Sequence, residues 1–399
     1  MVSGVIGTGS GAAWRRSLAC LTAAGLLTTT VACGGAAPGP ASGSASGSAR
    51  GSVAHGGDAL IVLSASFVSA STGWLLAYSP CAYQVRTCRT VVVRKTVDGG
   101  RTWSAVHAPD VPPTGIIQGR PPATGVGAIL FTSARSGWAF GPALWQTRDG
   151  GLTWRKMRGP GGPVLDLGVA GDRVLAVTGR CGVDYPACSF RVYSAAAGSD
   201  DWLGIPGAVG TGVSSVRLAV SGGVGYVFAV PADLGKPQLI AGPVSGAVRW
   251  RSLPVPCRFA WSGALAASPD GWLFLGCGGE PGAGNQLKTA WLSDDGARSW
   301  RKLATPPFGG YLASASMSTG GTIFLSGERM DVYISWDRGR SWHESPSLEN
   351  AVGLAEAGFP LVGMTVTDTR GFAFQEGAAA QQVWLSRDGG RHWTPVTVR

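Results

Sequence analysis

The sequence predicts an all-β fold built from a repeated four-stranded unit, and three observations lead to this expectation. The 399 residues include 63 Gly and 16 Trp, and only 14% are charged, a composition that suits short strands and tight turns. No long stretch shows the 3.6-residue apolar periodicity of a capped helix. A short box rich in Asp, Gly and Trp recurs along the chain at a near-constant spacing.

The box has the pattern [S/T]-x-D-x-[G/A]-x-x-W. Its five copies occupy residues 96–103, 147–154, 293–300, 335–342 and 386–393. Two degraded copies end at Trp202 and Trp250. The closing tryptophans of the seven copies are Trp103, Trp154, Trp202, Trp250, Trp300, Trp342 and Trp393. They are 51, 48, 48, 50, 42 and 51 residues apart, so the repeat is about 48 residues long.

A second element precedes each box by roughly 30 residues and consists of an apolar strand, a Gly-containing turn and another apolar strand. It occupies residues 67–77, 131–141, 169–179, 218–230, 265–276, 315–327 and 365–375. A third strand leads into the box, and a fourth begins at the box tryptophan. Four strands in each of seven units predict a seven-bladed β-propeller of four-stranded antiparallel blades over residues 58–399.

Each box is expected to be structural. Its aspartate (Asp98, Asp149, Asp295, Asp337 or Asp388) sits in a tight turn, where a carboxylate accepts hydrogen bonds from amides one or two residues on. The tryptophan is expected to bury its ring against the adjacent sheet. One catalytic aspartate does not need five equivalent copies, so ligand binding by the box is the weaker interpretation.

These boxes resemble Asp-box repeats, also called bacterial neuraminidase repeats. The version "TVDGGRTW" at residues 96–103 is similar to propellers of the photosystem II assembly/stability-factor type, and the resemblance covers about residues 59–398. Related repeats occur in sialidases and in xyloglucan-degrading enzymes. The resemblance implies a propeller fold, but such boxes occur in families with unrelated activities.

The resemblance does not carry a catalytic site onto this chain. Sialidases need convergent arginines, the first usually in an Arg-Ile-Pro motif that is absent here, and their propellers have six blades. Xyloglucan-type enzymes use two propellers. No remaining carboxylate pair, Ser/His/Asp set, phosphate loop or metal set is marked by the sequence, so we expect no catalytic residue, cofactor or metal. A sialidase-like glycoside hydrolase remains the alternative.

The N-terminus predicts export. Arg15 and Arg16 precede a short apolar stretch that ends in "TVAC" at residues 30–33. This resembles the lipobox of an actinobacterial-type lipoprotein, although Thr30 stands where the pattern usually has Leu. We expect residues 1–32 to be a signal peptide and Cys33 to carry the lipid. Cleavage at a nearby site to give a secreted protein is the alternative, and the export route, Sec or twin-arginine, stays open.

Residues 33–57 are expected to be a flexible tether rich in Gly, Ala, Ser and Pro. Removing residues 1–32 takes away two arginines and no acids, so the net charge of +10 becomes +8. A basic exported protein favours anionic lipid or wall polymers, but arginine preference in a high-GC genome explains the charge equally well.

Six cysteines outside the signal peptide and lipobox fall into three pairs. The pairs are Cys81/Cys88, Cys181/Cys188 and Cys257/Cys277. An even number in an exported protein predicts three disulfides. Zinc is the alternative, but CxxC spacings are missing and no histidine lies near these cysteines in the sequence.

Antiparallel blades place the boxes at one end of the ring and the predicted disulfides at the other. Long loops on a rigid scaffold commonly bind ligands, so the end opposite the boxes is the expected binding face. Its candidate residues are Tyr83, Arg86, Arg120, Arg180, Asp184, Tyr185, Arg258, Glu280, Asn285, Glu349 and Glu356. For each of them, a solvated loop position is the alternative.

At the box end, Arg101, Arg298, Arg340 and Arg391 hold one position in four boxes, with Arg148 and Arg387 nearby. They form either a basic rim for phosphate groups or a solvated set that stacks on neighbouring tryptophans. We expect a monomeric, lipid-anchored binding or assembly module on the outer face of the cytoplasmic membrane. Its partner would be an envelope protein or glycan and not a nucleic acid.

Overall fold

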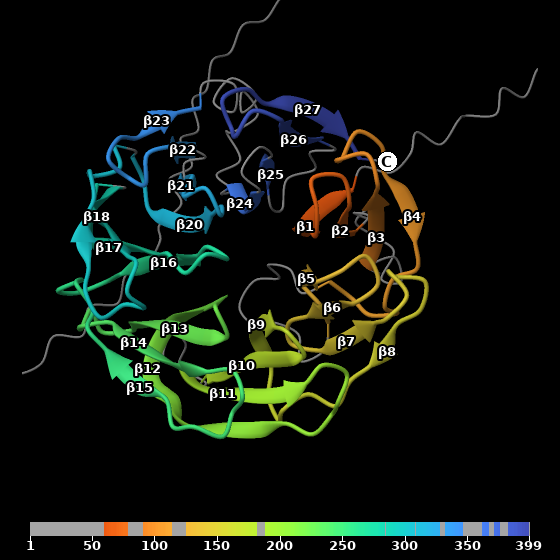
Figure 1. The fold of residues 1–399 in the computed structure, drawn as a ribbon, viewed down its shortest axis with the longest axis horizontal. Coiled ribbons are helices and arrows are strands. Elements are labelled where there is room, and N and C mark those ends of the chain that lie inside the picture. The colour runs from red at the N-terminus through yellow and green to blue at the C-terminus, as the bar shows by residue number, and fades with distance from the viewer. Residues whose placement is uncertain are drawn as a thin grey trace, which may run out of the picture. The chain divides into compact units, whose positions relative to one another are not determined.

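In the computed structural model of the protein, residues His55–Arg399 make one compact unit. The structure describes residues 60–78, 91–113, 125–181, 188–283, 285–307, 309–327, 332–345, 361–366, 371–375 and 382–398. Every regular element in these ranges is a β-strand, and no helix in them is long and apolar enough to cross a membrane. The sheets surround a common centre, with the first strand of each sheet innermost (Figure 1).

Five sheets each contain four antiparallel strands in sequential order. We number the blades in chain order. Blade 1 contains β1 (Ile61–Phe67), β2 (Gly73–Tyr78), β3 (Val91–Thr96) and β4 (Ser104–Val106). Blade 2 contains β5 (Ala128–Phe131), β6 (Gly137–Phe140), β7 (Leu144–Thr147) and β8 (Arg155–Lys156). Blade 5 contains β16 (Ser262–Ala267), β17 (Leu273–Gly282), β18 (Asn285–Ser293) and β19 (Arg301–Lys302).

The last two blades repeat the same order. Blade 6 contains β20 (Leu312–Met317), β21 (Ile323–Gly327), β22 (Val332–Ser335) and β23 (His343–Glu344). Blade 7 contains β24 (Leu361–Val366), β25 (Gly371–Gln375), β26 (Gln382–Ser386) and β27 (Thr394–Thr397).

The sixth sheet has seven strands and differs from the expected separate blades. Blade 3 contains β9 (Val164–Ala170), β10 (Arg173–Cys181) and β11 (Cys188–Ala196), and blade 4 contains β13 (Val224–Pro231), β14 (Gln238–Pro243) and β15 (Arg251–Leu253). The 19-residue strand β12 (Leu203–Ser221) pairs with β11 through its first part and with β13 through its second part. The strand therefore completes both blades, and the described strands fall into seven four-stranded units.

Innermost strands of blades 3 and 4 are also joined by a carboxylate. Asp166 on β9 accepts hydrogen bonds from the amides of Leu167 (2.8 Å) and of Leu218 on β12 (2.9 Å). Burial raises the pKa of Asp166, and these hydrogen bonds and the charge of Arg217 oppose that rise. The carboxylate thus satisfies a backbone donor across the joint between the two blades.

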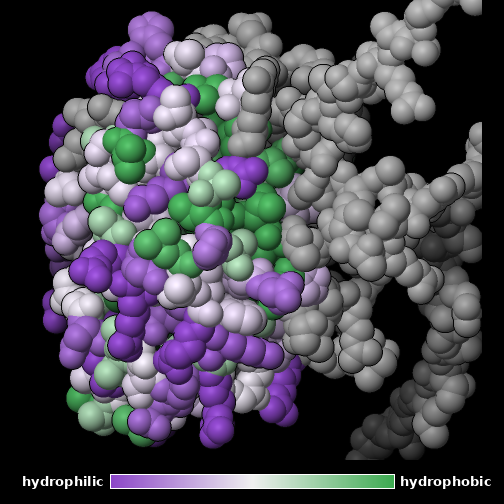
Figure 2. All heavy atoms as spheres, turned by 90° about the vertical axis from the view of Figure 1, so that its right-hand side faces the viewer, coloured by the Kyte–Doolittle hydropathy of each residue, from purple (hydrophilic) through white to green (hydrophobic). Residues whose placement is uncertain are grey.

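Burial changes in a regular way from the inner to the outer strands. The second strands are buried almost throughout, as in β6 and β21, because each blade is packed between two others. The short outermost strands β8 and β19 have the sequence Arg-Lys and are exposed. On the wall that carries β4 and β8, hydrophilic residues dominate around a smaller hydrophobic patch (Figure 2).

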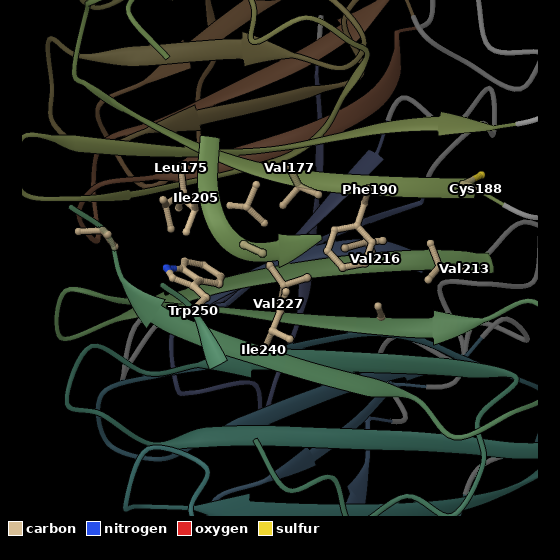
Figure 3. Packing of buried hydrophobic residues seen from close by; sticks show 14 residues of the cluster. Leu175, Val177, Cys188, Phe190, Ile205, Val213, Val216, Val227, Ile240 and Trp250 are labelled. Atoms are coloured by element: carbon tan, nitrogen blue, oxygen red, sulfur yellow. The ribbon is translucent and has the colours of Figure 1, made fainter. Parts of the chain in front are cut away.

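Hydrophobic cores lie between consecutive blades. Alternate residues of one strand enter opposite cores: Trp74 and Leu76 pack toward blade 2, and Leu75 and Ala77 pack toward blade 7. The core between blades 3 and 4 extends from Trp250 at one end to Cys188 at the other (Figure 3). Each blade thus completes the core of both neighbours.

The ring closes by packing. Leu60, Val62 and Leu75 of blade 1 share a core with Val383 and Leu385 of blade 7. The sequence left open a second way to close the ring, in which residues 52–60 form an extra strand. Residue 60 contributes its side chain to this core without belonging to a strand, and residues 52–59 lie outside the described residues.

We expect Leu385→Ala to lower the free energy of unfolding by about 2–5 kcal/mol, because it leaves a cavity in the core that closes the ring. Leu385 is 5% exposed, whereas Leu152 is 58% exposed and serves as the matched control. Leu152→Ala should change stability by no more than about 0.5 kcal/mol. Urea unfolding of both variants measures this, and equal stabilities would contradict closure through this core.

Candidate functional site

Hydrogen bonds place the boxes at the same end of the ring as the turns between the first and second strands. In blade 1, the Gly99 amide donates to the Ser71 carbonyl (2.8 Å), and in blade 2 the Gly150 amide donates to the Arg135 carbonyl (2.8 Å). We call this the box end. The turns between second and third strands, and the connections from one blade to the next, lie at the opposite end.

The box of blade 2 shows how the turn is held. The Thr147 hydroxyl donates to Asp149 Oδ1 (2.8 Å) and accepts from the Gly151 amide (2.9 Å). Asp149 Oδ1 also accepts from the Thr153 amide (2.9 Å), and its Oδ2 accepts from the Thr153 hydroxyl (2.5 Å). The carboxylate is therefore committed to the turn.

The other four boxes repeat this arrangement. Their aspartates are Asp98, Asp295, Asp337 and Asp388, each bonded to the residue two positions before it and the residue four positions after it. In the last box, His392 Nδ1 contacts Asp388 Oδ2 where the others have a hydroxyl.

The expected partners of the aspartate were wrong in detail. The sequence predicted acceptance from amides one or two residues on, but the carboxylate of Asp295 accepts from amides three and four residues on, at Arg298 and Ser299. The reason is that the Ser293 hydroxyl at the start of the box takes the buried Ala297 amide first. The carboxylate then orients that hydroxyl and reaches the later part of the turn.

The hydrogen bonds also lower the pKa values of the box aspartates. The Thr102 hydroxyl lowers the pKa of Asp98 to about 2, and the Thr153 hydroxyl, followed by the Thr153 amide, lowers that of Asp149 to about 2. The Ser299 hydroxyl holds the pKa of Asp295 well below its usual range. The charged form is thus the one that the fold requires.

Several box tryptophans connect blades, although the indole of Trp393 donates to the Gly390 carbonyl of its own box (3.0 Å). The indole of Trp154 in blade 2 donates to the His107 carbonyl at the end of blade 1 (2.9 Å). Trp202, Trp300 and Trp342 donate in the same way to carbonyls of the preceding blade, those of Arg158, Pro254 and Ala304. Trp250 reaches blade 3 with its backbone amide, which donates to the Pro206 carbonyl (2.8 Å).

The arginines of the box end are all exposed, and some turn back onto the protein. Arg298 and Arg391 donate to the carbonyls of their own box aspartates, Asp295 and Asp388. Arg391 also lies 4.6 Å from the ring centre of Trp336 in blade 6. Arg148 lines an open depression of about 370 Å³ that also includes Arg155, which pairs with Asp200. Stacking on tryptophan was one of the two predicted roles of these arginines.

The structure describes only some of the residues that the sequence predicted for the binding face at the opposite end. Arg180, Arg258, Glu280 and Asn285 are described, and all four are exposed. The residues Cys33, Cys81, Cys88, Tyr83, Arg86, Arg120, Asp184, Tyr185, Glu349 and Glu356 lie outside the described residues.

The paired cysteines that are described lie at this end: Cys257 and Cys277 form a disulfide, with Cα atoms 6.0 Å apart. Cys188 is also disulfide-bonded and is in register with Cys181.

An open groove of about 450 Å³ lies on blade 3 toward this opposite end. The face of β10 that packs on blade 2 through Ala176 continues beyond it to Thr178 and Arg180. Thr178 is still buried at 6% exposed, and the face becomes exposed at Arg180, because β10 and β11 have nine residues each, whereas β7 and β8 of blade 2 have four and two. We call this surface the blade 3 groove.

Two arginines dominate the blade 3 groove. Arg180 Nη2 donates to the Gly161 carbonyl (2.8 Å), which fixes that guanidinium beside the groove. Arg191 is exposed, and its guanidinium has no hydrogen-bond or ion-pair partner within the described part of the chain. A second hollow of about 200 Å³ shares Arg191 and Val209 with the groove and extends it along β12.

Apart from these two arginines, the described lining of the blade 3 groove is uncharged. It includes hydroxyls of Thr178, Ser189 and Tyr193, together with Val209, and no Asp or Glu is among the described lining residues. A guanidinium pair beside hydroxyls binds carboxylates through charge-assisted hydrogen bonds. The groove is therefore suited to an extended ligand that carries acidic groups.

Sequence reasoning found Arg180 but missed Arg191, Tyr193 and Val209, because it searched loops and these residues lie on strands. A signal was present in "SFRVYS" at residues 189–194, where Ser189, Arg191 and Tyr193 alternate with Phe190 and Val192. Polar residues at every second position mark an uncovered strand face in a fold whose middle strands are otherwise buried.

The comparisons place the fold among known proteins. No protein-family model and no curated protein matches the sequence. The structure is similar to YCF48 bound to a D1 peptide, with a TM-score of 0.53, 17% identity, and coverage of 86% of this chain and 95% of the other. It is also similar to YCF48 from Cyanidioschyzon merolae, with a TM-score of 0.55, 14% identity, and coverage of 83% and 96%.

A GH74 enzyme from Niastella koreensis matches with a TM-score of 0.44 and 12% identity, over 84% of this chain and 66% of the other. The protein is an all-β propeller of four-stranded antiparallel sheets, as the sequence predicted.

We expect Asp295→Ala to destabilise the protein by about 1–3 kcal/mol, because the charged carboxylate satisfies several donors of the turn. Asp294→Ala is the matched control: it removes the same charge one residue earlier, at an exposed side chain outside this hydrogen-bond set. A depressed pKa contributes stability that is complete above the ordinary value of about 4 and is lost as the pH falls through the folded value. The difference between the variants, measured by thermal unfolding, should therefore shrink below pH 4. An equal loss in both variants would contradict the structural role.

Proposed function

We propose that the protein is an extracytoplasmic β-propeller, tethered to the membrane through lipidated Cys33, that binds another envelope protein. The blade 3 groove receives an extended, acidic segment of that partner. The observation that carries this proposal is Arg191, an exposed guanidinium without a described partner in a groove whose described lining holds no acid. A carboxylate from a partner supplies the missing counter-charge.

A peptide fits the groove better than a compact ligand does. The blade 3 groove and the adjoining hollow share Arg191 and Val209, so together they form an elongated surface rather than a closed pocket. The exposed side chain of Val209 adds an apolar contact to this surface beside Arg191. YCF48 bound to a D1 peptide shows that a propeller of similar fold accepts a peptide, which supports this class of ligand.

A glycan is the other partner class that the sequence left open, and a sialidase-like hydrolase is the alternative function. No specific contact in the groove favours either of them. Glycosidic hydrolysis in particular requires two carboxyl groups about 5–10 Å apart, and no Asp or Glu is among the described lining residues of the groove. Both are therefore outcomes of the experiment below.

The test places a photo-crosslinking amino acid at Val209 in the lipidated protein within its own envelope. Val209 is 47% exposed and lines the groove, and Val248 is a matched control because it is 52% exposed at the box end of blade 4. We expect a discrete protein adduct from position 209 and none from position 248. The adduct should decrease at least tenfold when Arg191→Ala is added, since the substitution removes the free guanidinium.

Retention of the adduct in the Arg191→Ala background, or an adduct only at position 248, would contradict the groove as the binding site. Arg298→Ala controls for loss of one positive charge, because Arg298 is exposed at the box end. Capture of a glycan, or release of fluorophore from fluorogenic glycosides, would replace the protein partner with the corresponding alternative.

A further inference from the structure

Blade 5 exposes large apolar side chains at the end opposite the boxes. Phe259 is 39% exposed, Trp261 is 49% exposed and Leu287 is 75% exposed. Phe259 and Leu287 flank the same glycine, since both lie within 3.5 Å of the position that a Cβ on Gly279 would occupy. The Trp261 amide donates to the carbonyl of the adjacent Gly278 (2.8 Å). We call Phe259, Trp261 and Leu287 the blade 5 patch.

The blade 5 patch is held rigidly. Cys257, two residues before Phe259, is 3% exposed and forms the disulfide with Cys277 on β17. Ala260, between the two aromatic residues, is completely buried in the core between blades 4 and 5. The backbone is thus fixed on both sides, and the aromatic rings stay at the surface because the anchoring residues occupy the interior.

The chain joins the propeller at the same end as the patch. The turn after β1 lies at the box end, because its Ser71 carbonyl accepts from the box of blade 1, so β1 begins at the opposite end, next to Leu60. By the same reasoning, β16 begins at that end immediately after Trp261. Residues 34–57, expected from their composition to form a flexible tether, would reach roughly 25–30 Å from a lipidated Cys33. With the lipidation of Cys33 proposed above, such a tether would keep the patch-bearing end near the membrane.

We propose that the blade 5 patch docks the propeller onto the membrane surface by inserting Phe259, Trp261 and Leu287 into the interfacial region of the outer leaflet. Tryptophan and phenylalanine suit this region because one part of it is apolar and the other is wet. Docking in this orientation presents the box end to the aqueous phase and brings the blade 3 groove close to the membrane.

Charge contributes little to this docking. Arg258 precedes Phe259 in the sequence and Glu280 follows Gly279, and these two exposed residues carry opposite charges. Binding therefore depends on apolar insertion more than on attraction to anionic lipid, and it should change less than threefold when phosphatidylglycerol is added to phosphatidylcholine vesicles. A strong dependence on anionic lipid would instead assign the membrane contact to exposed arginines of the protein, and it would contradict docking through the patch.

The orientation of the propeller on the membrane rests on the proposed tether, whereas insertion of the patch does not. The test therefore uses the unlipidated unit His55–Arg399, which contains the described hydrophobic cores. Its sedimentation with phosphatidylcholine vesicles measures membrane binding. We expect Phe259→Ser/Trp261→Ser to weaken binding at least tenfold, while Val97→Ser/Leu152→Ser at the box end leaves it unchanged. Val97 and Leu152 are 69% and 58% exposed, so the control removes comparable exposed apolar side chains.

Equal thermal unfolding of the two double variants establishes that both are folded. Absence of vesicle binding by the unsubstituted unit overturns the proposal, and so does unchanged binding of Phe259→Ser/Trp261→Ser. Formation of a dimer that depends on Trp261 would assign the patch to a second copy of the chain and also overturn it. Failure of the Val209 crosslink together with patch-dependent vesicle binding would reject only the partner proposal.

Discussion

One hydrogen bond recurs between neighbouring blades of the ring. In it, the indole of a box tryptophan donates to a carbonyl of the preceding blade. Trp154 and Trp300 each reach back across one blade boundary in this way. The geometry of each indole is set by the turn that precedes it, and the turn is set by a hydroxyl and a carboxylate. In these two boxes, a charged side chain at the surface thus orders the turn that carries the indole.

This constraint separates the two ends of the molecule. At the box end, the carboxylates are engaged with the turns, and Arg298 and Arg391 contact carbonyls of their own boxes. The opposite end is held by a different device, since the Cys257–Cys277 disulfide fixes a connection between blades. Because this end lacks the repeated box, its amino-acid sequence can differ from one blade to the next. The blade 3 groove and the blade 5 patch both lie at this end.

The repeat made most of the fold predictable from sequence. Period, strand order and the location of the boxes follow from local patterns, because each unit buries the same faces against its neighbours. The shared strand β12 was not predictable, since Pro206-Gly207 and Gly210-Thr211-Gly212 within Leu203–Ser221 are turn signals, yet the strand continues past them and pairs with both β11 and β13. The site was predictable only in part: Arg180 stood out beside a cysteine, whereas Arg191 became significant when the shorter strands of blade 2 left its face uncovered.

Hydrogen exchange by mass spectrometry on a Trp300→Phe variant tests the central claim, that the box tryptophan fastens its blade to the preceding one. The substitution keeps an aromatic ring but removes the donor to the Pro254 carbonyl. We expect faster exchange in two separated segments, the box at residues 293–300 and the end of blade 4 at residues 251–256, with the other blades unchanged. Faster exchange confined to the box, or no change in either segment, would contradict it.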